Sequence, residues 1–184
     1  KGEVANEQFQ QAAGGAYKFL DSEAFTADAP YMNDIAGIKA AGQNIRGPLA
    51  GSVDDTLAMR VGPFIDPNTG GVAGRDAQRI LRGVKMDRAA QSRKGEVGSD
   101  LFADQASNIL GATEDMITRQ APHVVPQLNS ANQAYMNAMI LNDATAAAMN
   151  NGGVFFPSQL GQAARKNVKA FGGKNKTGTT ARPF

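Results

Sequence analysis

Apolar residues recur at spacings of three and four along most of this chain, which is the period of an amphipathic helix. Residues 6–25 show the pattern first, with Phe9, Tyr17 and Leu20 on one stripe. A second helix is expected to start at Asp28 or Ala29, since proline at position 30 suits the first helical turn. No stretch shows the strict alternation of a strand, so the pattern predicts an all-α protein.

Later helices are marked by their caps and breakers. Ser99 is expected to be an N-cap, and Gly111 to divide the helix that follows it. The residues from Asp66 to Gly71 form a turn cluster. The expected helices run from about Arg75 to Ala90, from Ser99 onward, from Val125 or Gln127 to Met149, and from Pro157 to about Phe171.

Together these segments predict an elongated helical bundle of about six or seven helices, with Gly/Pro-rich connectors and a flexible basic C-terminal tail. We expect an acidic N-terminal helical segment at 1–58, a central helical domain at 59–150, and a docking helix with the basic tail at 151–184. The chain starts at Lys1 rather than Met, so we expect a processed product or part of a longer protein. The sequence contains no run of about 18 apolar residues, so no membrane-spanning helix is predicted.

Composition argues against an enzyme. The chain has no Cys, which excludes disulfides, thiolate zinc sites and a cysteine nucleophile. Its single histidine, His123, lies in a proline-flanked connector, where a surface position is expected. The pairs Asp54–Asp55 and Glu114–Asp115 would point about 100° apart on a helix, too far to share one substrate. We therefore expect no catalytic residue, no cofactor and no dedicated metal site.

Charge is distributed unevenly although the net charge is only +2. Residues 1–58 carry eight acidic and four basic residues, whereas residues 75–94 carry seven basic and two acidic ones. Residues 144–184 carry six basic residues and no acidic one. This polarity indicates regions that meet a negatively charged partner.

Two basic groups are the candidate contact residues. Spacings of three and four place the first group on or beside one helix face; it comprises Arg75, Arg79, Arg82 and Lys85, with Arg88 beyond it. The second group comprises Arg165, Lys166 and Lys169, and leads into the basic tail. Nucleic acid, lipid headgroups or an acidic protein groove would suit either group. A solvated helix face and a solubilising tail remain the simpler alternatives.

The stretch "NGGVFFPSQL" predicts a docking element. Gly152 and Gly153 allow the chain to reverse, and Phe155 and Phe156 add apolar bulk. The helix that follows is expected to pack back through Leu160, so that these residues dock on the body of the protein or on a neighbouring subunit.

Four stretches carry a family resemblance. They are "GGVAGRDAQRIL", "LFADQASNIL", "LNSANQAYMNAMILNDATAA" and "GGVFFPSQLGQAAR". In this order they resemble a C-terminal region of large tailed-bacteriophage internal virion or ejection (DNA-transfer) proteins, some of which carry a lytic transglycosylase domain elsewhere. The resemblance covers roughly residues 70–170. Phe156 departs from it, since that family usually has Thr before the proline.

The resemblance implies a non-enzymatic virion structural protein, in the tail, the portal region or the internal core. Its partners would be copies of itself and other phage proteins of the portal, tail or core, with contact to double-stranded DNA and transient contact with the host envelope. Delivery into that envelope on infection would follow. The alternatives are a DNA-binding packaging or scaffold protein, and a non-catalytic accessory region of a phage peptidoglycan hydrolase.

Overall fold

The fold is taken from a computed structural model that describes residues 15–149 and 156–171. Side chains of residues 92–94, 142, 148–149 and 166–171 lie outside that description. The α-helices are α2 (Ala29–Gly42), α3 (Ser52–Arg60), α4 (Gly74–Lys94), α5 (Ser99–Gln120), α6 (Val125–Met149) and α7 (Pro157–Phe171). The strands are β1 (Ala24–Thr26) and β2 (Gly71–Ala73), and the 3-10 turns are η1 (Lys18–Ser22), η2 (Gly47–Leu49), η3 (Gly62–Phe64) and η4 (Pro122–Val124).

The described part of the chain is all-α with six α-helices, as the apolar periodicity predicted. Residues 15–131 form one compact unit, and the described residues from 132 onward belong to a second. The predicted boundary between residues 58 and 59 falls within α3, and the boundary at 150 falls after α6.

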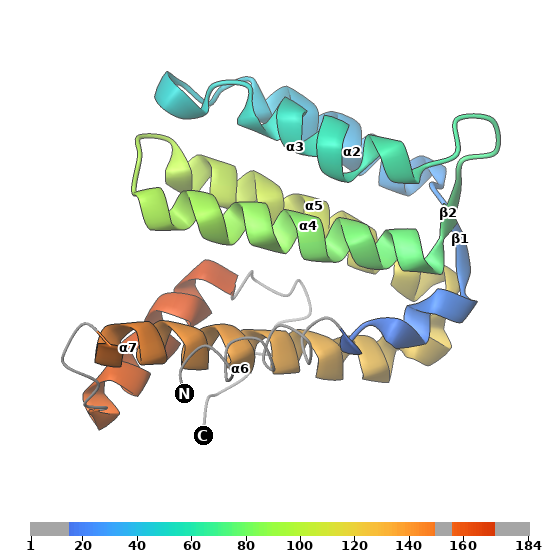
Figure 1. The fold of residues 1–184 in the computed structure, drawn as a ribbon. Helices are drawn as coiled ribbons and strands as arrows, with labels where there is room; N and C mark the ends of the chain where they lie inside the picture. The colour runs from blue at the N-terminus through green and yellow to red at the C-terminus, as the bar shows by residue number, and fades with distance from the viewer. Residues whose placement is uncertain (1–14, 150–155, 172–184) are drawn as a thin grey trace. The chain divides into compact units, whose positions relative to one another are not determined.

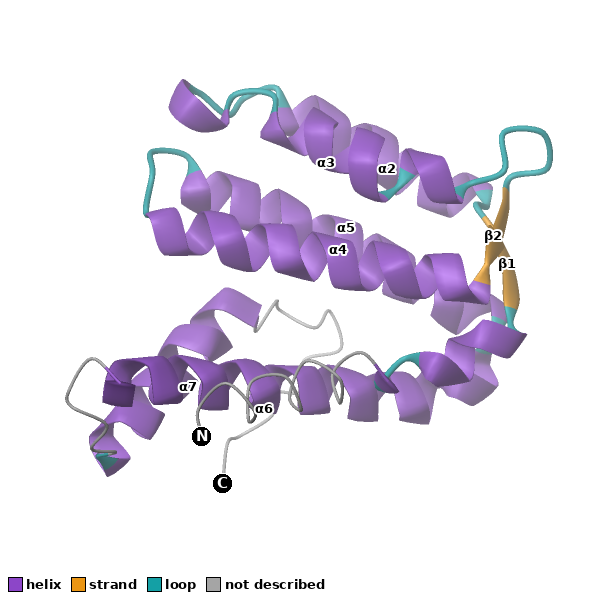
Figure 2. Ribbon diagram, in the orientation of Figure 1, coloured by secondary structure: helices purple, strands orange, loops and turns teal. Residues whose placement is uncertain are grey.

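In the compact unit four helices form two layers, α2 beside α3 and α4 beside α5 (Figure 1). Successive helices run in opposite directions, and a short β-ribbon lies at the end where α2 and α4 begin (Figure 2). The apolar faces of the helices bury one continuous core between the layers. Its largest fully buried side chains include Tyr17, Leu20, Tyr31, Ile80, Leu81, Phe102, Ile109, Met116 and Ile117.

Helix α2 starts where its cap residue predicts. The carboxylate Oδ1 of Asp28 accepts a hydrogen bond from the Tyr31 amide at 3.0 Å, and Pro30 lies in the first turn. Such a cap satisfies one of the amides that a helix N-terminus leaves unpaired. This cap also places Asp28 next to the ribbon, where a second set of contacts uses it.

The β-ribbon was not predicted. Phe25 pairs with Val72 in an antiparallel register, where the sequence pattern had predicted that a helix continues to residue 25. Each strand has only three residues, and its buried–exposed pattern is too short to be separated from helical spacing. The turn at Asp66–Gly71 was predicted, and Asp66 Oδ1 accepts from the Asn68 amide there at 2.8 Å.

Gly74 fixes the junction between the ribbon and α4. Its amide donates to the Glu23 carbonyl at 2.9 Å. A Cβ atom at this position would lie 1.6 Å from the carbonyl oxygen of Leu20. Only glycine fits this close approach of two backbones.

Two expectations about α5 are wrong. Gly98 occupies the N-cap position with φ of 94°, and Ser99 is the first helical residue, whose hydroxyl donates to the Gln91 carbonyl at 3.3 Å. Gly111 does not divide the helix, which continues to Gln120. Burial of apolar positions on both sides of Gly111 outweighs the roughly 1 kcal/mol that a helical glycine costs.

Helix α7 starts at Pro157, as predicted. The side-chain Oε1 of Gln159 accepts from the Phe156 amide at 2.9 Å, which closes the first turn. The predicted reversal at Gly152–Gly153, the side chain of Phe155 and the predicted flexible tail from residue 172 lie outside the described residues.

Candidate partner-contact surface

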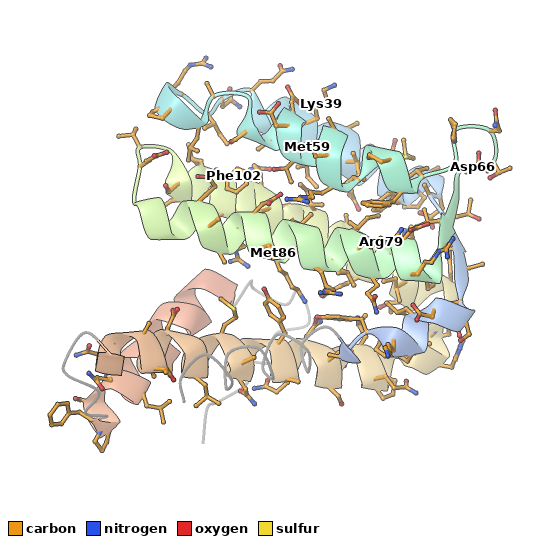
Figure 3. All side chains as sticks on the ribbon, viewed as in Figure 1. Lys39, Met59, Asp66, Arg79, Met86 and Phe102 are labelled. Carbon is orange, nitrogen blue, oxygen red and sulfur yellow. The ribbon has the colours of Figure 1, made fainter. Side chains whose placement is uncertain are left out.

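Helix α4 presents a continuous exposed stripe to solvent. Arg75, Arg79, Arg82 and Met86 follow one another at spacings of four, three and four, and all four are exposed. Figure 3 shows Arg79 and Met86 on the same side of α4. The opposite side of α4 carries Ile80 and Val84, both fully buried in the core. The arginine stripe is therefore a surface feature of a helix whose apolar face is already covered.

Arg79 is held in place by two neighbours. Its Nη1 donates to Asp76 Oδ1 at 2.8 Å, and its guanidinium carbon lies 5.9 Å from the ring centroid of Phe64. The side chain of Arg79 nevertheless remains 58% exposed. The positive charge is thus fixed in position but open to a partner.

The acidic residue further along α4 is also engaged. Asp87 accepts from Nε and Nη2 of Arg60 on α3, both at 2.9 Å. A Cβ atom on Gly83 would lie 2.8 Å from Arg60 Cδ, so glycine there lets Arg60 cross α4 closely. Asp76 and Asp87 are thus paired with Arg79 and Arg60, and neither is hydrogen-bonded to Arg75 or Arg82.

Lys85 does not belong to the exposed stripe, and this corrects the sequence-based expectation. It is 6% exposed, and its Nζ donates to the hydroxyl of Tyr17 on the segment before η1. Ten residues separate it from Arg75, which turns it about 80° away from the stripe. Arg88, placed beyond the row by its spacing, is also buried at 6%.

Burial sets the protonation behaviour of Lys85. Loss of hydration lowers its pKa to about 8, with Arg88 acting in the same direction and the carboxylate of Glu114 opposing both. The Tyr17 hydroxyl accepts a hydrogen bond from this ammonium and so replaces one of the water molecules that burial removes. Lys85 is consequently an interior group of the bundle and not a surface contact.

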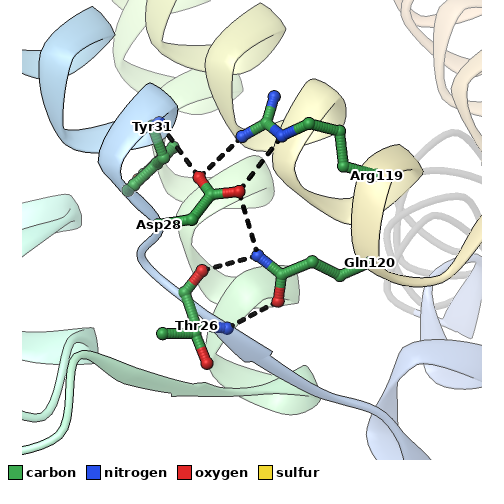
Figure 4. Close-up of polar contacts among 5 residues, drawn as sticks. All are labelled: Thr26, Asp28, Tyr31, Arg119 and Gln120. Carbon is green, nitrogen blue, oxygen red and sulfur yellow. Dashed lines mark hydrogen bonds and ion pairs between the residues drawn. The ribbon is translucent and has the colours of Figure 1, made fainter.

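A second polar group links segments far apart in sequence (Figure 4). Arg119 donates to both carboxylate oxygens of Asp28, and the side-chain amide of Gln120 pairs with the backbone N–H and C=O of Thr26, at 2.8 and 2.7 Å. Nearby, His123 Nε2 lies 3.1 Å from Glu23 Oε1. No sequence signal pointed to these contacts, since the partners lie more than 90 residues apart.

These contacts are structural. The pKa of Asp28 is lowered chiefly by its hydrogen bonds from Arg119, against a smaller raising effect of burial. Gln120 occupies the outer edge of β1, where it replaces a missing neighbouring strand. His123 is exposed, as its connector position predicted.

The C-terminal candidates lie on α7, in the second unit. Arg165 is exposed, whereas the side chains of Lys166 and Lys169 lie outside the described part. Phe156 and Leu160 are 50% and 38% exposed, and their docking role stays a prediction. The buried residues of this part of α7 are Gln159 and Ala163.

The described residues contain no group of three or more His, Asp or Glu side chains that could hold a metal ion. Within the same ranges, no helix combines the length and apolar character needed to cross a bilayer. No protein-family model matches the sequence, and no curated protein and no solved structure matches the chain.

Proposed function

We propose that this chain is a non-enzymatic structural protein of a tailed-bacteriophage particle. It assembles with copies of itself and with other virion proteins of the tail, portal region or internal core, and assists DNA delivery into the host. Four stretches between residues 70 and 170 resemble phage ejection proteins in their sequence and in the order in which they occur, and this resemblance supports the assignment.

The observation that carries the proposal is the pair of exposed apolar side chains Phe156 and Leu160. Phe156 directly precedes α7 and Leu160 lies in its first turn, and they are 50% and 38% exposed. Burying a side chain of this size is worth about 1.5–3 kcal/mol. Two exposed apolar side chains at the start of one helix suit contact with another subunit.

The polar groups of the compact unit favour the same class of function. Two of its ion pairs join one element to another: Arg60 with Asp87, and Arg119 with Asp28. Such cross-links stabilise a scaffold, and they leave the solvent-facing arginines and apolar side chains as its contact features.

The experiment has two arms. In the first, particles of the encoding phage are purified on a density gradient and examined for the chain by mass spectrometry. In the second, self-association of the purified chain is measured by sedimentation equilibrium for the wild type and for Phe156→Ser/Leu160→Ser. Gln162→Ser, at an exposed polar position of the same helix, is the matched control.

We expect the chain in intact particles, and weaker self-association for the double variant than for the control. Absence of the chain from particles would overturn the proposal. Cleavage of peptidoglycan by the purified chain would instead favour a region of a cell-wall hydrolase.

A further inference from the structure

The α3–α4 face of the compact unit offers a second contact surface, distinct from the exposed apolar side chains at the start of α7. Its exposed cations are Arg75, Arg79 and Arg82, and its two acidic neighbours on α4 are already paired. We propose that this face binds the phosphate backbone of duplex DNA, with Arg75 and Arg82 making the principal contacts. The choice of DNA rests on the proposed role in DNA delivery as well as on the chemistry of the face.

The spacing of the two arginines suits a duplex. Seven residues of α-helix correspond to a rise of about 10.5 Å, and they bring both side chains to the same side after two turns. Duplex DNA carries one phosphate charge per about 1.7 Å of its axis with both strands counted, so about six phosphates lie along that length of duplex, more than two arginines need. The guanidinium fork binds phosphate oxygens in pairs, which a lysine cannot do.

A lipid surface suits this face less well. Membrane-surface helices insert a broad apolar side between the headgroups. The apolar side of α4 is buried in the core through Ile80, Leu81 and Val84 and cannot insert. The arginine stripe itself contains no large apolar residue before Met86.

Single-stranded nucleic acid is also a poorer fit. Proteins that bind it place aromatic side chains where bases can stack. The aromatic residue beside this stripe, Phe64, is partly buried against the core and already lies next to the guanidinium of Arg79. The face therefore offers charge to a backbone without a stacking platform.

The test compares two charge reversals of equal size in the full-length chain. Arg75→Glu/Arg82→Glu alters the proposed face. Lys39→Glu/Arg46→Glu alters exposed bases on and just after α2, which lies in the other layer of the unit (Figure 3). Fluorescence anisotropy with a labelled 30-base-pair duplex measures affinity between 50 and 200 mM salt.

We expect the wild type to bind, the α4 variant to lose at least tenfold in affinity at the lowest salt, and the control to lose less than threefold. The plot of log affinity against log salt has a negative slope, and loss of two phosphate contacts should make that slope shallower by about two. Circular dichroism shows whether the charge reversal disturbs folding. If it does, a second variant, Arg75→Gln/Arg82→Gln, tests the same contacts. It removes the two charges without reversing them and should therefore give an intermediate loss of affinity.

Several results would overturn the inference. They are no duplex binding by the wild type, equal losses in both reversals, tighter binding of single strands, and displacement of the duplex by polyglutamate or anionic vesicles at matched charge. Any of them could occur while the chain is still found in particles and still self-associates through α7. Failure here is thus separable from failure of the proposed function.

Discussion

Arg119, at the end of α5, donates to both carboxylate oxygens of Asp28, the N-cap of α2, at 3.1 and 2.7 Å. One carboxylate thus closes the start of one helix and binds the end of another. Because the two residues are 91 positions apart, this pair fixes a relationship that local sequence cannot specify.

Arg119→Ala should lower the free energy of unfolding by about 1 kcal/mol at pH 6, since both side chains are partly exposed to solvent. The lowered pKa of Asp28 gives stability that is present above the unfolded value of about 3.9 and is lost as pH falls. The difference in free energy of unfolding between the wild type and Arg119→Ala, measured by urea denaturation, should therefore be smaller at pH 3 than at pH 6. A difference that is unchanged at pH 3 would contradict the charge-pair interpretation. Arg75→Ala, at an exposed position of α4, is the control.

Gln120→Ala should increase the rate of hydrogen exchange at the Thr26 amide. The side chain of Gln120 accepts from that amide at 2.8 Å, and among the described residues no strand lies on that side of β1 to replace it. We expect roughly a tenfold increase, corresponding to about 1.4 kcal/mol, measured by NMR against the Asn68 amide, which donates to the Asp66 carboxylate instead. Equal acceleration at both amides would indicate general loosening instead.

Gly74→Ala should destabilise the compact unit by about 3 kcal/mol or more, because the new Cβ atom would meet the Leu20 carbonyl. Gly37→Ala is a matched control within α2. No atom lies within 4 Å of the Cβ position there, so alanine should add about 0.5–1 kcal/mol of stability. Thermal melting of both variants checks the pair, and a Gly74→Ala protein as stable as wild type would refute the close approach.

The buried Lys85 should make the stability of the protein increase with pH in the alkaline range. Its pKa in the folded protein is about 8, below the unfolded value of 10.5, so the unfolded chain binds more protons between these two pH values. Stability should then rise with pH from about 8 to 9.5, by on the order of 2 kcal/mol. Above pH 10 the raised pKa of buried Tyr31 acts in the opposite direction, because the folded state then holds the proton more tightly.

Chemical denaturation of wild type and Lys85→Met across pH 7.5–9.5 measures this effect. We expect the variant to show a flat profile over that interval. Parallel profiles for the two proteins would show that another group causes the response.

Much of the helical framework could be predicted from the sequence. The cap at Asp28 and the proline at position 157 marked helix starts that the structure confirms. Caps and prolines act within one turn, so a single sequence contains the whole interaction.

The parts that could not be predicted depend on distant residues. The β-ribbon needs residues 24–26 and 71–73 together, and Gln120 reaches Thr26 only because α5 ends beside it. Lys85 was assigned to the surface because charge usually indicates solvent, but its angular position faces Tyr17. For the contact residues, spacing identified the exposed stripe of α4, and only the fold showed which acidic neighbours are already paired.

The long-range cross-links of the compact unit have a mechanical consequence. The β-ribbon, the Asp28–Arg119 pair and the amide pairing of Gln120 all lie at one end of the four helices. The other end has the turn at Gly47 and the exposed Val97, and there the hydroxyl of Ser99 on α5 donates to the Gln91 carbonyl of α4 at a longer 3.3 Å. When the protein is heated or pulled, the helices should separate at that end first, while the contacts at the ribbon end still hold them together.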